Sequence, residues 1–391
     1  MVLPFAVRLR RPRRDAPKLP GLAFAAQEPG SRMSVAIVTG AGGLVGAEAV
    51  RFLDAKGLDV IGIDNDTRAT LFGAGASTRR TRAGLERSLP RYTHLDADIR
   101  DGAMIERVFA RHGADIVLVV HAAAQPSHDR AASDPKTDFS INAEATLGLL
   151  EAARKHCRDA VFVFCSTNKV YGDTPNRLPL VRHETRWELP DSHPMFAGID
   201  EAMSIDAAMH SLFGVSKCAA DLMVQEYGRY FGMRTACFRC GCITGGGQAG
   251  AMLHGFLSYM VKCAVTGRRY TVIGHEGRQV RDNIHSWDLV NAFWQFFEAP
   301  CAAGVFNMGG GRTANCSVLE AIAMTEALTG RPMQRDYQGE SRAGDHVWWV
   351  SDTRRFEEHC PGWRLTRGIP DMIAEMHDVA ASRAGQQDGL E

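Results

Sequence analysis

The sequence predicts an α/β fold built on a doubly wound parallel sheet, with a smaller C-terminal lobe. Two observations support this prediction. Short apolar runs rich in β-branched residues alternate with stretches of helical periodicity, which is the order of βαβ units and gives parallel strands. Past about residue 240 the alternation becomes irregular, as expected of a segment that completes a pocket. Ligands of such sheets bind beyond the carboxyl ends of the strands.

Each element follows from its local pattern. The first strand is expected over residues 34–40, and an amphipathic helix over residues 43–57, where Gly57 ends it. Apolar runs predict further strands over residues 59–66, 114–124 and 159–172, and helical spacing predicts a helix over residues 139–156. In the lobe we expect helices over residues 255–267 and 316–330, and strands or turns over residues 270–274 and 304–311.

Composition excludes several classes of function. Lys and Arg together number 45, as do Asp and Glu, so the net charge is zero and gives no general attraction to nucleic acid or membranes. No apolar run approaches the ~20 residues that span a bilayer. Hydrophobic residues make up 45% of the 391 residues, which is enough for a buried core.

The ten cysteines raise the question of a metal site, because Cys237, Cys240 and Cys242 lie close together. A zinc site would need a second ligand pair at comparable spacing, and the sequence has none. The alternative is structural thiols in a buried strand that runs into a glycine loop, and we expect that and no metal. Without a disulfide framework, the chain is expected to be cytoplasmic.

The first 32 residues differ from the rest. They are rich in arginine and proline and lack the apolar stretch of a secretory signal. We expect a disordered basic extension here. A functional basic arm, or an upstream extension of a protein that starts at Met33, are the alternatives left open.

A glycine-rich turn predicts a dinucleotide site of the Rossmann type. In "TGAGGLVG", Gly40, Gly43 and Gly46 follow a strand and open a helix, so that backbone N–H groups and the helix dipole face a pyrophosphate. Asp64 ends the second strand, at the spacing of a ribose-binding carboxylate, and would repel a 2′-phosphate; NAD is therefore favoured over NADP. Asp98 and the neighbouring Ile99 are candidates for the adenine edge. The alternative is a glycine turn of another α/β fold.

An ordered set of motifs goes further. "TGAGGLVG", "HAAAQPS", "STNKVYGD", the Ser216–Lys217 pair and "RQVRDNIHSWDL" resemble the extended short-chain dehydrogenase/reductase family, in particular its nucleotide-sugar epimerases and dehydratases and the CDP-paratose 2-epimerase branch. The resemblance covers about residues 33–380. It implies a Rossmann domain that binds NAD and carries the catalytic residues over residues 33–240, a mainly substrate-binding lobe over residues 241–380, and a flexible tail over residues 381–391.

The resemblance also implies the cofactor and catalytic residues. A sugar hydroxyl would be oxidised to a transient ketone by NAD and reduced again, with Lys217 holding the nicotinamide ribose and Thr167 bonding the reacting oxygen. The implied cofactor-binding residues are Gly40, Gly43, Leu44, Val45, Gly46, Asp64, Asn65, Asp98, Ile99, Ala122, Ala123, Ala124, Asn142, Lys217 and Arg239.

Two departures from the family pattern matter. Asn168 and Lys169 follow Thr167, where 4,6-dehydratases carry an Asp–Glu pair; an amide is no general acid, so a standard 4,6-dehydratase is disfavoured. Phe213 stands at the position of the usual catalytic tyrosine and cannot carry a proton. Either the site is degenerate, or another group moves the proton, or the reaction does not need the tyrosine.

The candidates for the displaced proton transfer are Lys217, Thr167, His210 and Glu201. His210 would share a helix face with Phe213, and Glu201 lies in an acidic stretch before that helix. A surface histidine and a capping carboxylate are the alternatives.

At the substrate end, arginine forks match phosphate oxygens. The predicted substrate-binding residues are Gln125, Asn168, Lys169, His254, Arg281, Arg342 and Asp345. The favoured activity is NAD-dependent epimerisation of a nucleotide sugar by a homodimer. A dehydratase of a nucleoside or nucleotide sugar with non-tyrosine chemistry is the alternative, and a catalytically silent NAD-binding protein is a second one.

Overall fold

The computed structural model describes residues 34–248, 255–339 and 344–388. The proposed basic extension, residues 1–32, lies outside the described residues. Within the described ranges, no helix is long and apolar enough to cross a membrane.

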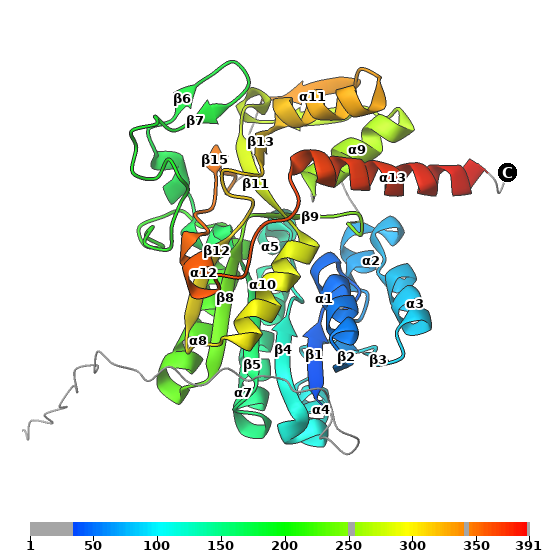
Figure 1. The fold of residues 1–391 in the computed structure, drawn as a ribbon, viewed down its shortest axis with the longest axis vertical. Helices are drawn as coiled ribbons and strands as arrows, with labels where there is room; N and C mark the ends of the chain where they lie inside the picture. The colour runs from blue at the N-terminus through cyan, green and yellow to red at the C-terminus, as the bar shows by residue number, and fades with distance from the viewer. Residues whose placement is uncertain (1–33, 249–254, 340–343, 389–391) are drawn as a thin grey trace, which may run out of the picture. The chain divides into compact units, whose positions relative to one another are not determined.

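A seven-stranded sheet forms the centre of the fold, and all of its strands are parallel (Figure 1). The strand order is β12-β8-β5-β4-β1-β2-β3, so successive crossovers change direction between β1 and β4, as in a doubly wound fold. The predicted fold class is confirmed. The strands are β1 (Val35–Thr39), β2 (Asp59–Ile63), β3 (Tyr92–Leu95), β4 (Ile116–His121), β5 (Val161–Thr167), β8 (Arg234–Cys240) and β12 (Gly304–Met308).

Helices cover both faces of this sheet because side chains alternate between the faces along each strand. Ala36 and Val38 of β1 belong to one apolar cluster, and Val35 and Ile37 belong to the other. The first cluster packs against α1 (Leu44–Ala55), α3 (Arg79–Ser88), α10 (Ser286–Glu298) and α12 (Arg354–His359). The second packs against α4 (Gly102–His112), α7 (Ala145–His156) and α8 (Leu212–Phe231).

The lobe occupies the upper part of Figure 1, and a short mixed sheet runs through it. In that sheet β11 pairs with β13, β15 and β9, while β10 pairs separately with β14. The lobe elements are β9 (Cys242–Thr244), α9 (Phe256–Thr266), β10 (Tyr270–Ile273), β11 (Val280–His285), β13 (Asn315–Ser317), α11 (Val318–Thr329), β14 (Arg335–Gln338), β15 (Trp348–Trp349) and α13 (Ile369–Asp388).

The chain does not divide at residue 240 as simply as predicted. β12 returns to the large sheet beside β8, and α10 and α12 cover it, because their side chains complete the first apolar cluster. Residues 381–388, predicted as part of a flexible tail, continue helix α13. Both Trp348 and Trp349 are fully buried, and Trp349 stacks on Tyr171 at 5.5 Å between ring centroids. Neither tryptophan can therefore stack on the nucleobase of a ligand.

The remaining described elements decorate the large sheet. They include α2 (Thr67–Phe72), α5 (His128–Ser133), α6 (Pro135–Phe139) and the hairpin of β6 (Val181–Arg182) and β7 (Trp187–Glu188). α6 continues into a single π turn, Ser140–Glu144, before α7 begins.

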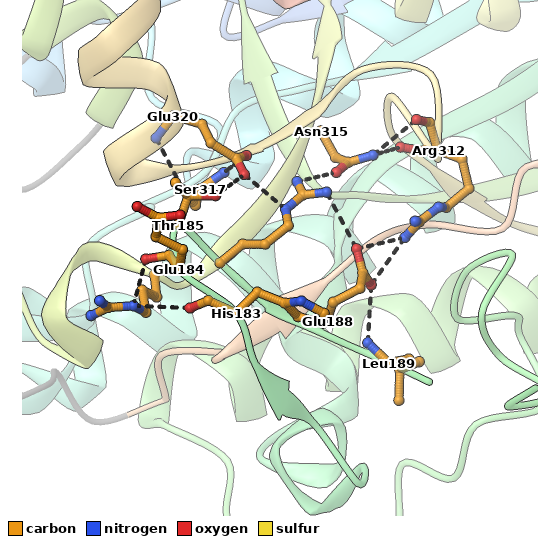
Figure 2. Close-up of polar contacts among 12 residues, drawn as sticks. His183, Glu184, Thr185, Glu188, Leu189, Arg312, Asn315, Ser317 and Glu320 are labelled. Atoms are coloured by element: carbon orange, nitrogen blue, oxygen red, sulfur yellow. Dashed lines mark hydrogen bonds and ion pairs between the residues drawn. The ribbon is translucent and has the colours of Figure 1, made fainter. Parts of the chain in front are cut away.

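A polar network ties the hairpin to the lobe (Figure 2). The buried carboxylate of Glu188 accepts hydrogen bonds from Arg312 at 3.1 Å and from Arg186 at 3.3 Å. Arg186 also forms an ion pair with Glu320 of α11 at 3.1 Å, and the Thr185 hydroxyl donates to the same carboxylate at 2.8 Å. Two carboxylates, Glu188 and Glu320, thus join the hairpin to the segment of the lobe that carries Arg312 and α11.

Candidate active site

The glycine turn after β1 has the close approaches that a phosphate cradle needs. Gly40 adopts φ +70°, and the N–H of Gly43 donates to its carbonyl at 2.9 Å. A Cβ placed on Gly46 would lie 2.0 Å from the Gly40 oxygen, so only glycine lets α1 start this near the turn. The residues present therefore fit a dinucleotide whose pyrophosphate lies at the α1 N-terminus.

Asp64 stands at the carboxyl end of β2, beside this turn. Its carboxylate accepts hydrogen bonds from the Gly42 N–H at 3.0 Å, the Asp66 N–H at 2.8 Å and the Thr78 hydroxyl at 3.0 Å. The Asn65 side-chain amide donates to Asp98 at 3.1 Å. This hydrogen bond links the residues predicted to bind the ribose to those predicted to bind the adenine. These contacts orient a carboxylate toward the place where a ribose would bind.

One cavity of about 560 Å³ connects the glycine turn to the lobe. It lies beyond the carboxyl ends of the strands, at the crossover switch between β1 and β4. The predicted residues that line it are Gly40, Gly43, Leu44, Val45, Gly46, Asp64, Asn65, Asp98, Ile99, Ala122, Ala123, Ala124, Thr167, Asn168, Lys169, Phe213, Lys217, Arg281 and Asp345.

Lys217 and Thr167 both line this cavity, between the glycine turn and the lobe. Lys217 is buried, and its ammonium group donates to the Cys165 carbonyl at 2.9 Å and lies 4.0 Å from the Phe164 ring centroid. Burial lowers the pKa of Lys217. The Thr167 hydroxyl accepts a hydrogen bond from the Lys169 N–H at 3.2 Å, at the end of β5. A cation and a hydroxyl therefore both stand on the wall of this cavity.

Phe213 faces the cavity one helical turn before Lys217. Ser211 caps α8 by accepting from the Gly214 N–H at 3.1 Å, which fixes where the helix begins. Against the Phe213 ring lies the imidazole of His128, with ring centroids 5.0 Å apart, and both side chains line the cavity.

At the lobe end, three charged side chains form a cluster. Arg281 of β11 forms an ion pair with Asp345, and the Lys169 ammonium donates to the Gly344 carbonyl at 2.9 Å. Burial lowers the pKa of Lys169 to about 8, against the opposing charge of Asp345. Burial raises the pKa of Asp345, but the charges of Arg281 and Lys169 outweigh it and hold that pKa well below its usual range. The cluster offers cationic donors to an anionic ligand.

Two predicted proton carriers lie outside the cavity. The Nε2 of His210 lies 2.9 Å from the Ile205 carbonyl, and its Nδ1 faces the Lys169 carbonyl at 3.4 Å, so backbone groups occupy both sides of the ring. The carboxylate of Glu201 accepts from the backbone N–H of Asn307 at the end of β12, and burial raises its pKa. In this structure both hold loops outside the cavity wall, and a catalytic role for either stays a prediction.

Gln125 and Asn142 were predicted to face the substrate and the cofactor, and instead they bind one another. The Asn142 side chain accepts from the Gln125 N–H at 2.9 Å and donates to the Gln125 carbonyl at 3.1 Å. Asn142 also donates to the Ser216 hydroxyl at 3.0 Å, and the Gln125 amide donates to Asp138 at 2.7 Å. All four groups are buried behind the wall of the cavity, where they hold α6 and α8 to the loop after β4.

Arg239, predicted to bind the cofactor, is buried beside α8. Its guanidinium pairs with Asp221 of α8 at 2.8 Å and donates to the Tyr171 hydroxyl at 2.9 Å, and it does not line the cavity. Odd and even positions of β8 point to opposite faces of the sheet, so the neighbouring Cys240 lines the cavity and Arg239 does not. The predictions for His254 and Arg342 fall outside the described residues.

Sequence reasoning missed His128 and Arg68, which both line the cavity. His128 follows "HAAAQPS", so its place beyond the end of β4 was an available signal. No sequence pattern indicated Arg68, because the fold of the loop that carries α2 brings this helix to the cavity wall. Among the described residues, no group of three potential ligands could hold a metal, and the ten cysteines are free thiols.

Known proteins resemble this chain over most of its length. The CDP-paratose 2-epimerase of Salmonella typhi is 28% identical over 353 residues, which cover 88% of this chain and 99% of that protein. The dTDP-glucose 4,6-dehydratase of Shigella flexneri is 27% identical over 288 residues, covering 70% of this chain and 71% of that protein.

Solved structures share the fold. The UDP-glucose 4-epimerase of Bifidobacterium longum, in complex with NAD⁺ and UDP, has a TM-score of 0.72 at 24% identity, over 90% of this chain and 99% of that one. Pal from Bacillus thuringiensis has a TM-score of 0.73 at 19% identity, over 89% and 99%.

A family profile covers most of the cofactor end and the site. Residues 36–309, more than half of the chain, match the profile described as "NAD dependent epimerase/dehydratase family". The matched range includes the glycine turn, Asp64, Thr167 and Lys217, whose geometry fits the named cofactor. The chain therefore belongs to the NAD-dependent epimerase/dehydratase family and is an enzyme that uses NAD.

Proposed function

We propose that the enzyme epimerises a nucleotide sugar, in the manner of CDP-paratose 2-epimerase. The observation that carries the proposal is the single cavity whose wall runs from the glycine turn, past Thr167 and Lys217, to the cationic cluster of Lys169 and Arg281. One end suits a dinucleotide, the middle has groups that handle a hydroxyl, and the far end suits a second phosphate-bearing ligand. The similarity to CDP-paratose 2-epimerase along 99% of that protein's length supports the choice of reaction.

The cofactor end belongs to the Rossmann part of the chain. The glycine turn and the α1 N-terminus would hold the pyrophosphate of NAD, and Asp64 would hold the adenosine ribose. NAD supplies an acceptor and donor of hydride, so that a sugar carbon can be oxidised and then reduced on the opposite face.

The chain's own residues handle the hydroxyl. Lys217 is held by the Cys165 carbonyl and brings a positive charge to a buried place, where it favours an oxygen that is losing its proton. The hydroxyl of Thr167 can donate a hydrogen bond to that same oxygen. Both groups are fixed by the sheet and by α8, so little reorganisation is needed during the reaction.

The lobe would bind the diphosphate. Asp345 holds the Arg281 guanidinium at the cavity wall, and a planar guanidinium presents paired donors to phosphate oxygens. An ammonium carries three donors, and the Lys169 hydrogen bond to Gly344 uses one of them. The substrate-binding role of Asn168 stays a prediction, supported by its place on the cavity wall.

We also propose that the enzyme is a homodimer that pairs through α7 and α8. Leu147 of α7 is exposed, and so are Val215 and Leu222, which lie two helical turns apart on one face of α8. Leu222→Glu, which places a charge on that apolar face, would give a monomer in light-scattering measurements if these helices form the interface.

The test is incubation of the NAD-loaded enzyme with a panel of CDP-, UDP- and dTDP-sugars in deuterated water, read by mass spectrometry and NMR. A product of unchanged mass, inverted at one carbon and free of deuterium, would support epimerisation at the oxidised carbon. A product lighter by one water would identify a dehydratase instead. Tight NAD binding without conversion of any sugar would refute both.

Two lysine variants make the test specific. Lys217→Met should abolish conversion, because it removes the charge that favours ionisation of the hydroxyl while it keeps a similar volume. The matched control is Lys136→Met, since Lys136 is exposed on α6 and does not line the cavity. Equal activity in both variants would contradict the role given to Lys217.

A further inference from the structure

Three cysteine side chains stand on the wall of the cavity, and the proposed reaction uses none of them. Cys165 lies near the end of β5, Cys240 ends β8, and Cys242 begins β9. All three are free thiols; Cys165 and Cys242 are partly exposed, whereas Cys240 is buried. A thiol is a good nucleophile only as the thiolate, so its surroundings decide whether it reacts.

Cys165 and Cys240 lie on neighbouring strands and face the same side of the large sheet. Thr167 is the register partner of Cys240, and Cys165 precedes Thr167 by two residues, so both residues of β5 point to the face of the first apolar cluster. The two thiols form a hydrogen bond with one another. The Phe238 carbonyl, 3.4 Å from the Cys240 sulfur, is the other acceptor for the Cys240 proton. A Cys165 thiolate is the stronger acceptor of the two because it is charged.

A positive charge lies beside the same residue. The Lys217 ammonium group donates to the backbone carbonyl of Cys165 at 2.9 Å. The hydrogen bond from Cys240 lowers the pKa of the Cys165 thiol, and the Lys217 charge lowers it further, although burial opposes both. Burial raises the pKa of Cys240 and brings that of Cys242 to about 11. Of the three thiols, Cys165 therefore has the surroundings that favour a thiolate.

We propose that Cys165 is a reactive thiol and a site of covalent modification by small electrophiles and peroxides that enter the NAD cavity. It stands on the wall of the same cavity as the glycine turn and Lys217. A group added to its sulfur occupies space that the cofactor needs, so the modified protein should bind NAD weakly. Bound NAD should in turn shield the thiol. The inference takes this cavity to be the NAD site and is independent of the sugar that the enzyme converts.

The modification balances with either reagent class. With iodoacetamide the thiolate attacks the methylene carbon, a carbon–sulfur bond forms, and iodide leaves with the electrons of the carbon–iodine bond. With hydrogen peroxide the thiolate attacks one oxygen, the oxygen–oxygen bond breaks, and hydroxide leaves, so sulfur is oxidised to a sulfenic acid while the peroxide is reduced. An added thiol then displaces water to form a mixed disulfide, and a second thiol releases Cys165 in its reduced form.

The test is the rate at which iodoacetamide alkylates each cysteine at pH 7, read by mass spectrometry of peptides. Cys242 is the matched comparison inside the cavity, because it is also partly exposed there. Cys218 is the comparison outside it, since it is partly exposed on α8 and does not line the cavity. Cys165 should react at least about tenfold faster than either, because more of it is thiolate. Equal rates for the three would overturn the proposal.

Two variants test the cause of the reactivity. Lys217→Met should slow alkylation of Cys165 about tenfold, since one pKa unit changes the thiolate fraction by that factor. Cys240→Ala should slow it about threefold or more, because the donor to the sulfur is lost. Lys136→Met, on the exposed side of α6, is the control and should react like the wild type. Thermal unfolding shows that each variant is folded, and unchanged rates in both folded variants would contradict the proposal.

Shielding by NAD gives a readout that needs no turnover. In the full chain, alkylation of Cys165 should be at least about tenfold slower after NAD is restored to protein stripped of nucleotide with charcoal, while Cys218 keeps its rate. Peroxide should abolish NAD binding by the stripped wild type, and dithiothreitol should restore it. Cys165→Ser should bind NAD within about threefold of the wild type and keep that affinity in peroxide. A thiol that reacts equally fast with NAD bound, or a Cys165→Ser protein that peroxide inactivates like the wild type, would refute the inference. Conversion of no sugar would refute only the proposed function.

Discussion

Replacing Gly46 by alanine should separate α1 from the glycine turn and weaken NAD binding. The added Cβ would lie 2.0 Å from the Gly40 oxygen, where ordinary contact begins at 3.4 Å, so the two backbones must part by about 1.4 Å. Backbone cannot rotate away as a side chain can, and overpacking of this kind costs about 1–3 kcal/mol. Loss of one charged hydrogen bond to the pyrophosphate adds about 1.5–3 kcal/mol, which is roughly ten- to hundredfold in Kd.

Calorimetric titration with NAD and thermal unfolding of the protein without added NAD measure the two effects separately. The matched control is Gly148→Ala in α7, where a Cβ meets no atom within 4 Å. That variant should gain up to about 1 kcal/mol from helix propensity and bind NAD like the wild type. If Gly46→Ala bound NAD within twofold of the wild type and unfolded at the same temperature, the close approach would not be what fixes the turn.

Three further predictions follow from the site and its supports. Affinity for a nucleotide diphosphate should be constant below about pH 8 and should fall above it, by up to tenfold per pH unit. The reason is that Lys169, whose pKa burial lowers to about 8, binds the anion only when protonated. The Lys169→Arg variant should show no such pH dependence. Asp64→Ala should weaken NAD about tenfold in the same titration and narrow the preference over NADP, since it removes the carboxylate that repels a 2′-phosphate. Glu188→Gln should lower the free energy of unfolding by about 1–3 kcal/mol in urea, since Arg186 and Arg312 lose a buried charged acceptor.

Each of these predictions has an outcome that would contradict it. An affinity that stays constant to pH 9.5 in the wild type would remove Lys169 from the phosphate site. Unchanged discrimination against NADP in Asp64→Ala would mean that another group reads the ribose. For Glu188 the comparison is Glu86→Gln, whose i,i+4 pair with Arg82 is largely exposed and should cost no more than about 0.5 kcal/mol; equal losses would mean that the hairpin network adds nothing.

The sequence was enough to predict the sheet and the cofactor end, because the signals there are local. Apolar β-branched runs define the strands of the large sheet, and a glycine turn between a strand and a helix needs no distant partner. β12 was harder to place, because a fully buried strand has the same continuous apolar sequence pattern whether it joins the lobe or returns to the large sheet. Its position depends on packing against α12, which lies far along the chain.

The misplaced site residues share one cause. Gln125, Asn142 and Arg239 stand near strand ends or on helices beside the cavity, but which way a side chain points depends on register and on the neighbouring elements. Asn142 points into the contact between α6 and α8 because its side-chain amide donates hydrogen bonds to Asp138 and Ser216 there. For His128 the sequence offered its place beyond the end of β4, but that its side chain lines the cavity depends on how the short helix α5 packs, which no periodicity predicts.

The return of β12 has a consequence for how the protein comes to be made. The large sheet is not complete until the strand Gly304–Met308 has been synthesised, so the edge of β8 stays open while the first part of the lobe is added. An open edge with an apolar face invites pairing with other chains. A fragment that ends near residue 240 should therefore aggregate rather than bind NAD, and cofactor binding becomes possible only late in synthesis, when the lobe has begun to fold around the same cavity.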